Sequence, residues 1–94
     1  MSSTVTIRRS EAADAAAIER LAALDSASAP PGEMLLAEVG DELWAAVGLD
    51  GTAAIADPFR PSGDLVELLN FRVERIRREL AKPARRPRLL PRVA

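Results

Sequence analysis

The chain of 94 residues contains no cysteine, no histidine and no tyrosine. Without cysteine it can form no disulfide, and without cysteine or histidine it offers no thiolate or imidazole ligand to a metal. Catalysis by a Cys-His or Ser-His-Asp arrangement and pH switching by histidine are excluded for the same reason. The remaining possibilities are chemistry based on carboxylates and a function based on binding.

Long hydrophobic runs are also lacking. The N-terminal residues, MSSTVTIRR, contain no apolar core of the kind found in signal peptides. No apolar stretch approaches the roughly 20 residues that a membrane-spanning helix needs. The sequence therefore predicts a protein without a signal peptide or membrane span, located in the cytoplasm.

The apolar content is made largely of small side chains. Hydrophobic residues form 48% of the chain, but 18 of them are alanine, and the only aromatic residues are Trp44, Phe59 and Phe71. A single domain of this length already buries a smaller fraction of its surface than a larger one does. We therefore expect marginal stability for the isolated chain, which association with a partner would increase. Trp44 is expected in the core or an interface. Phe59 is expected at one end of the core, with a docking surface over 57–61 as the alternative.

Charge is divided unevenly along the chain, although the net charge is only −1. Residues 1–71 carry four basic and twelve acidic side chains, whereas residues 72–94 carry nine basic and two acidic ones. Such an asymmetry is typical of chains with an interaction segment at one end.

Alternation of β-branched and polar residues predicts a strand over 4–9, and apolar segments separated by turn residues predict strands over 34–39, 42–49 and 52–56. Gly40-Asp41 and Asp50-Gly51 are typical of two-residue hairpin turns. Helices are expected from an N-cap at Asp14 to Leu24, and from Ser62 or Asp64 to Leu80, the latter with a capping box of Asp64 and Glu67. The apolar stripe of the second helix is predicted as Leu65, Leu69, Val73, Ile76 and Leu80.

The expected strand over 42–49 is apolar on both sides. With strict alternation, one face of the sheet would carry Leu43, Ala45, Val47 and Leu49. The other face would carry Trp44 and Ala46. A strand of this kind lies inside a sheet that is covered on both faces. The sequence thus predicts an α+β fold of order β-α-β-β-β-α, with two helices and a mostly antiparallel four-stranded sheet. The folded domain is expected over 1–81, followed by a basic Pro/Arg-rich segment over 82–94.

This order, with these residues, resembles the N-terminal half of the GNAT acetyltransferase fold. The segment VTIRRSEAADAAAIERLAALD (5–25) is similar to that family's first strand and helix, and LLAEVGDELWAAVGL (35–49) to its next two strands. The resemblance covers about residues 4–80. It implies the fold of a half domain, because the family's further strand, helix and hairpin have no counterpart here.

In that family, a glycine-containing turn before the second helix binds the pyrophosphate of acetyl-CoA through backbone N–H groups and the positive helix end. The resemblance assigns this role to Arg60 and Gly63 of the segment RPSGDL. The segment departs from the family pattern in three ways: Pro61 removes a donor, Asp64 adds negative charge, and Leu65 replaces a small residue. These departures favour an ordinary N-capped helix start over a phosphate site. No catalytic residue, metal ligand or cofactor is assigned.

The expected strand over 52–56 forms an open edge of the sheet, because no further strand follows it. Its residues, Thr52, Ala53, Ala54, Ile55 and Ala56, carry no charge that would discourage pairing with another chain. The basic segment 82–94 could cover this edge, or a second copy could pair with it. The sequence predicts the second, a homodimer with a two-fold axis between the copies.

The basic segment 82–94 leaves several alternatives open. It could lie on an acidic protein surface, remain solvated, or neutralise phosphates of a nucleic acid, although no aromatic residue is interleaved for base stacking. Binding to a membrane surface is disfavoured, because Leu89, Leu90 and Val93 are too few to anchor it. The leading interpretation is a non-catalytic GNAT-like protein that acts by association, as a homodimer or accessory subunit. The alternatives are an N-acetyltransferase whose acetyl-CoA site is completed across a dimer, and a nucleic-acid accessory protein.

Overall fold

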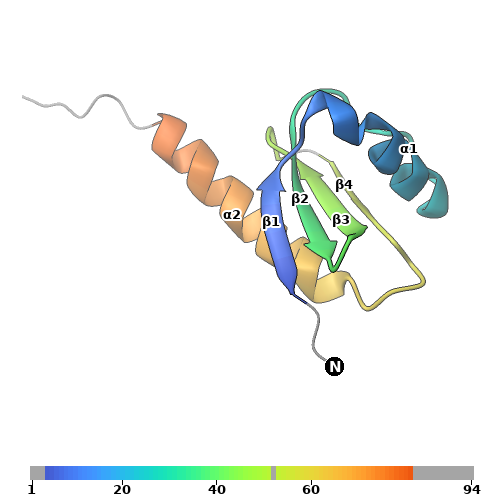
Figure 1. Ribbon diagram of the computed structural model, residues 1–94. Coiled ribbons are helices and arrows are strands. Elements are labelled where there is room, and N and C mark those ends of the chain that lie inside the picture. Colours follow the sequence, from blue (N-terminus) through green and yellow to red (C-terminus); the bar gives the residue numbers. More distant parts are fainter. Residues whose placement is uncertain (1–3, 52, 82–94) are drawn as a thin grey trace, which may run out of the picture.

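The computed structural model describes residues 4–51 and 53–81 (Figure 1). Four strands and two helices follow one another in the predicted order: β1 (Val5–Arg9), α1 (Ala15–Leu24), β2 (Met34–Val39), β3 (Glu42–Gly48), β4 (Ala54–Ala56) and α2 (Gly63–Ala81). A short 3-10 turn, η1 (Ala12–Asp14), leads into α1. The predicted α+β class and element order are confirmed. The basic segment 82–94 and Thr52 lie outside the described residues.

The sheet has the strand order β1-β2-β3-β4, and every neighbouring pair is antiparallel. Strands that follow one another in sequence therefore lie next to one another in space, which short connections favour. The predicted turn at Gly40-Asp41 joins Val39 directly to its partner Glu42, and Gly40 adopts a positive φ of 64°. This two-residue turn fixes the register of β2 against β3.

The predicted strict alternation of side chains along β3 is interrupted by a β-bulge. Ala37 is paired with Ala45, but the next residue, Glu38, is paired with Leu43, so Trp44 is the extra residue between them. An extra residue reverses which side chains face which side of the sheet. Leu43 therefore packs with Ala46, and not with Ala45 and Val47 as the alternation predicted.

The two helices cover opposite faces of the sheet (Figure 1). Leu21 and Ala22 of α1 pack on one apolar layer, with Met34, Leu36, Leu43, Ala46 and Ile55 from the strands. Leu69 and Val73 of α2 pack on the other layer, with Leu35, Ala37, Ala45 and Val47. β2 and β3 contribute to both layers, which is the two-sided burial predicted for the middle of the sheet.

The C-terminal part of α2 extends beyond the sheet (Figure 1). Leu69 and Val73 are buried and Leu65 and Ile76 are partly buried, as the helical stripe predicted, whereas Leu80 is 79% exposed. The last residue of the predicted stripe, Leu80, is therefore not buried, because the end of the helix extends beyond the strands. The first and middle turns of α2 therefore contribute to the core, and Leu80 in the last turn does not.

The connection between β3 and β4 is longer than the predicted two-residue turn. Gly48 donates its N–H to the Ala53 carbonyl at 2.9 Å, and Gly51 donates to the Gly48 carbonyl at 2.9 Å. Gly51 has a φ of 77°, and a Cβ at this position would lie 2.9 Å from Nη1 of Arg77. The backbone conformation thus favours glycine here, whereas the contact with the flexible end of Arg77 could be relieved by a shift of that side chain. β4 begins at Ala54 and is three residues long.

Candidate functional site

Arg60, the first of the two residues expected to bind a pyrophosphate, lies in the connection before α2. Its Nη2 is 2.9 Å from Glu42 Oε1 and its Nε is 3.9 Å from Asp57 Oδ2. Its guanidinium also lies over the ring of Trp44, 5.4 Å from the centroid. Arg60 therefore joins the connection to the β2–β3 hairpin, and an incoming phosphate would compete with Glu42 for it.

Trp44 is partly exposed within this cluster, where its Nε1 donates to Glu42 Oε1 at 3.2 Å. The expectation of a core or interface residue is thus met in part: the indole lies at the surface, covered on one side by the guanidinium. Phe59 is 79% exposed, so the prediction that it fills one end of the core is wrong. Its backbone N–H instead donates to Asp57 Oδ1 in a tight turn, which directs the ring to solvent.

Gly63, the second candidate residue, is the first residue of α2. The N–H of Val66 donates to the Ser62 carbonyl, so Ser62 is the residue preceding the helix, and its hydroxyl donates to the Asp57 carbonyl at 3.0 Å. Asp64 consequently lies within the first turn. Of the two predicted helix starts, the one at Ser62 agrees with the structure, and the predicted N-cap at Asp64 is wrong. Open space surrounds the position of a Cβ on Gly63.

The strongest electrostatic contact in the described part of the chain joins β1, η1 and β2. Arg8 donates to both carboxylate oxygens of Asp14, at 2.7 and 2.9 Å, and to both oxygens of Glu38, at 3.1 and 3.2 Å. Asp14 also accepts the backbone N–H of Glu11 at 2.7 Å. These hydrogen bonds favour the carboxylate, so they lower the pKa of Asp14 to about 2. The same contacts raise the pKa of Arg8.

This cluster was not anticipated from the sequence, where Asp14 was expected only to cap α1. Asp14 does precede α1, but its side chain bonds backwards to Glu11 and across to Arg8. With its carboxylates already bonded to an arginine, the cluster is a structural cross-link between the sheet and the start of α1. Among the described residues, no group of three acidic side chains is placed to hold a metal ion.

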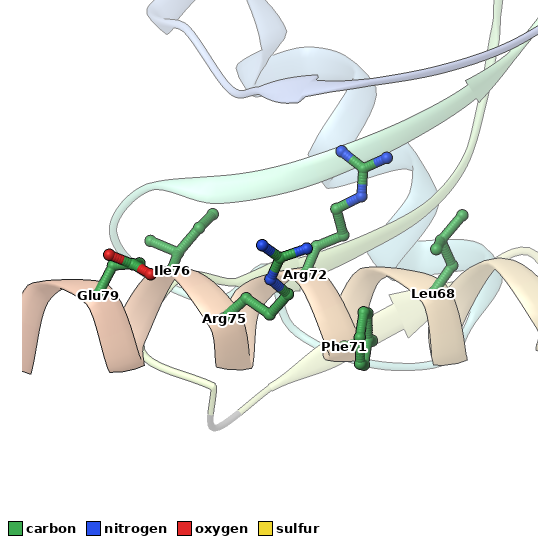
Figure 2. Close-up of a pocket in the computed structure, with 6 residues that line it drawn as sticks. All are labelled: Leu68, Phe71, Arg72, Arg75, Ile76 and Glu79. Carbon is green, nitrogen blue, oxygen red and sulfur yellow. The ribbon is translucent and has the colours of Figure 1, made fainter.

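The outward side of α2 carries a second unanticipated feature, a group of exposed apolar side chains among charges. Leu68 is 38% exposed and Phe71 is 57% exposed. Beside them lies a hollow of about 480 Å³, lined by Leu68, Phe71, Arg72, Arg75, Ile76 and Glu79 (Figure 2). The available signal in the sequence was an aromatic residue, Phe71, outside the apolar stripe of an amphipathic helix.

Figure 2 shows how these side chains leave the helix. Leu68, Arg72 and Ile76 point along one side of it, whereas Phe71 and Arg75 stand out from it. Phe71 thus presents its ring to solvent next to the stem of an arginine. An apolar surface of this kind, rimmed by charges, is typical of interaction sites.

The predicted interaction edge at 52–56 is described from Ala53 onward. The N–H of Asp57 bonds to the Trp44 carbonyl and the Ala53 carbonyl accepts from Gly48, so the backbone groups of Ala54 and Ala56 face away from β3. The N–H of Ala56 is taken by Asp25 Oδ2 at 3.1 Å, from the end of α1. The backbone groups of Ala54 therefore face outward at this edge, whereas the neighbouring outward N–H, that of Ala56, is bonded to Asp25.

No family model matches the chain, and no significant match was found among curated proteins or among solved structures. The resemblance to the GNAT fold therefore stays a prediction from the residues quoted for it. Within the described part of the chain, no helix has the length and apolar character required to cross a membrane.

Proposed function

We propose that the protein is a non-catalytic, GNAT-like half domain that acts through protein association, as a homodimer or as an accessory subunit, in the cytoplasm. The observation that carries this proposal is the exposed apolar surface of α2 around Leu68 and Phe71. Both side chains lie on a helix whose opposite side already packs against the sheet. Burying them against a partner would remove apolar area from water, which favours association.

The alanine-rich core supports the same proposal. The buried apolar residues include Ala22, Ala37, Ala45 and Ala46, each of which removes little surface from water. A domain with such a core gains proportionally more from an interface than one built on large side chains. The edge of β4 at Ala54 remains a second candidate interface. Fewer of its backbone groups are open to another chain, because the Ala56 N–H already donates to Asp25.

Sedimentation velocity of the full chain over a range of concentrations tests this function. We expect a concentration-dependent shift from monomer to dimer, accompanied by a rise in melting temperature with protein concentration, because association stabilises the folded state by mass action. A monomer at every concentration would contradict self-association. The proposal would then hold only in its second form, in which the monomer binds a different protein as an accessory subunit.

Binding of acetyl-CoA is the alternative function, favoured by the open start of α2 at Gly63 beside Arg60. A ligand bound only by the folded state stabilises it by about 2.7 kcal/mol at a hundredfold excess over Kd. For so small a domain this corresponds to a rise in melting temperature of roughly ten degrees. A rise that Arg60→Ala abolishes would support the alternative, and no rise at millimolar acetyl-CoA would contradict it.

The nucleic-acid alternative rests on residues 82–94, which lie outside the described residues. Removing them separates it from the other two functions. Salt-sensitive binding to nucleic acid that persists after the removal would contradict a role for this segment.

A further inference from the structure

Charges on the outward side of α2 are arranged symmetrically about Phe71. Asp64 and Glu67 precede it by seven and four residues, and Arg75 and Arg78 follow it by four and seven. All four side chains are exposed. We call the surface formed by Asp64, Glu67, Leu68, Phe71, Arg75 and Arg78 the outer face of α2.

These residues share one side of the helix. Positions seven residues apart lie within about 20° of each other around a helix axis, so Asp64, Phe71 and Arg78 form a row along it. Positions four residues apart are also neighbours, which places Glu67 and Arg75 on either side of Phe71 in the same strip. The strip is thus negative toward the start of α2 and apolar in the middle, and toward the end it carries Arg75 and Arg78 beside the single carboxylate of Glu74.

Three of these four charges have no ion pair with any residue in the described part of the chain: Asp64, Glu67 and Arg75. Arg78 contacts Glu74 at 4.0 Å, with both side chains about 70% exposed, and so loose a pair contributes little. Two other exposed arginines lie nearby: Arg77 is directed to Gly51, and Arg72 lines the hollow beside Phe71. The charges of the outer face are therefore available to a partner.

We infer that the outer face of α2 binds the outer face of a second copy, with the two helices antiparallel and a two-fold axis passing near Phe71. In such a pair, a residue n positions before Phe71 faces the residue n positions after it on the other copy. Asp64 then faces Arg78 and Glu67 faces Arg75, each twice because of the symmetry. The inference rests on the proposed function and specifies its partner and surface.

The apolar centre fits the same arrangement. The two Phe71 rings meet at the axis, where each can pack against Leu68 and the stem of Arg75 of the other copy, beside the hollow that these side chains line. Charges seven residues from the axis lie about 10 Å along each helix, which remains within reach when the helices cross at about 20°. A parallel pair would instead place like charges opposite each other and is disfavoured.

Charge reversal in the full chain tests this arrangement by sedimentation velocity. Glu67→Arg and Arg75→Glu, each alone, replace two attractive pairs per dimer by two repulsive ones, and we expect each to weaken dimerisation at least tenfold. When the two variants are mixed, every charge at position 67 faces an opposite charge at position 75. The mixture should therefore form a heterodimer with close to the affinity of the unmodified protein. Raising the salt concentration should weaken the unmodified dimer.

Matched control variants separate the outer face from general effects of charge and hydrophobicity. Glu19→Arg makes the same change of charge on α1, and Phe59→Ala removes another exposed ring; both should leave the dimer intact. Phe71→Ala should reduce dimerisation at least tenfold. Circular dichroism of each variant shows whether the helices remain folded.

The outcomes distinguish this inference from the proposed function. A dimer unaffected by Glu67→Arg and Phe71→Ala would overturn the outer face as the interface and leave self-association standing. Loss of the dimer in Ala54→Pro, which removes an outward-facing N–H, with the fold retained by circular dichroism, would then place the interface at the edge of β4. Single variants that stay monomeric when mixed would overturn the antiparallel register. A monomeric unmodified protein at all concentrations would overturn self-association itself.

Discussion

The two helices cover opposite faces of the same sheet but are held there differently. The ends of α1 are joined to the strands by polar contacts: Asp14 through Arg8, and Asp25 through the N–H of Ala56. α2 is held by buried apolar residues in its middle, Leu69 and Val73, and carries its charges outward. The carboxylates that flank α1 are thus bonded within the fold, whereas α2 presents exposed charges beside exposed apolar side chains, and both are available to a partner.

Truncation of buried leucines should have the largest effect on stability. Leu69→Ala removes a side chain that is 0% exposed, and we expect a loss of about 2–5 kcal/mol in the free energy of unfolding. Leu80→Ala, on the same stripe of α2, should change it by less than about 0.5 kcal/mol. Urea denaturation measures both. Equal losses would show that the end of α2 packs as closely as its middle and would remove the contrast between the helices.

The link between α1 and the sheet through Arg8 should make stability depend on acid pH. Because the pKa of Asp14 is lowered to about 2, its contribution is fully present above about pH 4 and is lost as the pH falls toward 2. Asp14→Asn should therefore lower stability at pH 5 and flatten its decline between pH 4 and 2. Glu19→Gln, which removes an exposed carboxylate of α1, serves as the control. An unchanged acid profile in Asp14→Asn would show that the link contributes nothing.

The link at the other end of α1 should have a smaller effect. Asp25→Ala removes the acceptor of the Ala56 N–H, at a cost of about 1 kcal/mol. Hydrogen exchange of the Ala56 amide should become faster, whereas Asp25→Asn, which keeps an oxygen at this position, should preserve part of the protection. Exchange that is equally slow in Asp25→Ala would indicate another acceptor at the β4 edge.

The smallest effect is expected at the start of α2, where Arg60 lies over Trp44. Arg60→Ala should cost about 0.5–1 kcal/mol and alter the fluorescence of the chain's single tryptophan, because the indole loses its covering guanidinium. Arg20→Ala on α1 provides the control. Unchanged fluorescence in Arg60→Ala would show that this contact is not formed in solution.

Regular patterns were the part of the fold that could be predicted. The helical spacing of Leu65, Leu69 and Val73 and the turn at Gly40-Asp41 act over a few residues, so the sequence displays them directly. Features that depend on distant residues could not be predicted in this way. The bulge at Trp44 reversed the face of Leu43, and the end of the sheet left Leu80 exposed.

In the candidate site, too, local patterns could be predicted and contacts between distant residues could not. Arg60 and Gly63 were selected from a local pattern, and the structure adds that Arg60 bonds to Glu42, a residue of the preceding hairpin. The symmetric spacing of the charges on the outer face of α2 is visible in the sequence. The sequence alone does not show which side of the helix the sheet covers. Packing of Leu69 and Val73 on the sheet is what turns Phe71 toward solvent.

By itself, the sequence determined the element order, the two-sided apolar character of the middle strands and the absence of cysteine and histidine chemistry, because these follow from composition and short-range periodicity. Only the tertiary structure decided which apolar residues stay exposed, which carboxylates Arg8 joins and how much of the β4 edge remains open. These features depend on where separate segments meet, and the free energy of such contacts is set by burial and by distances between residues that are far apart in the chain.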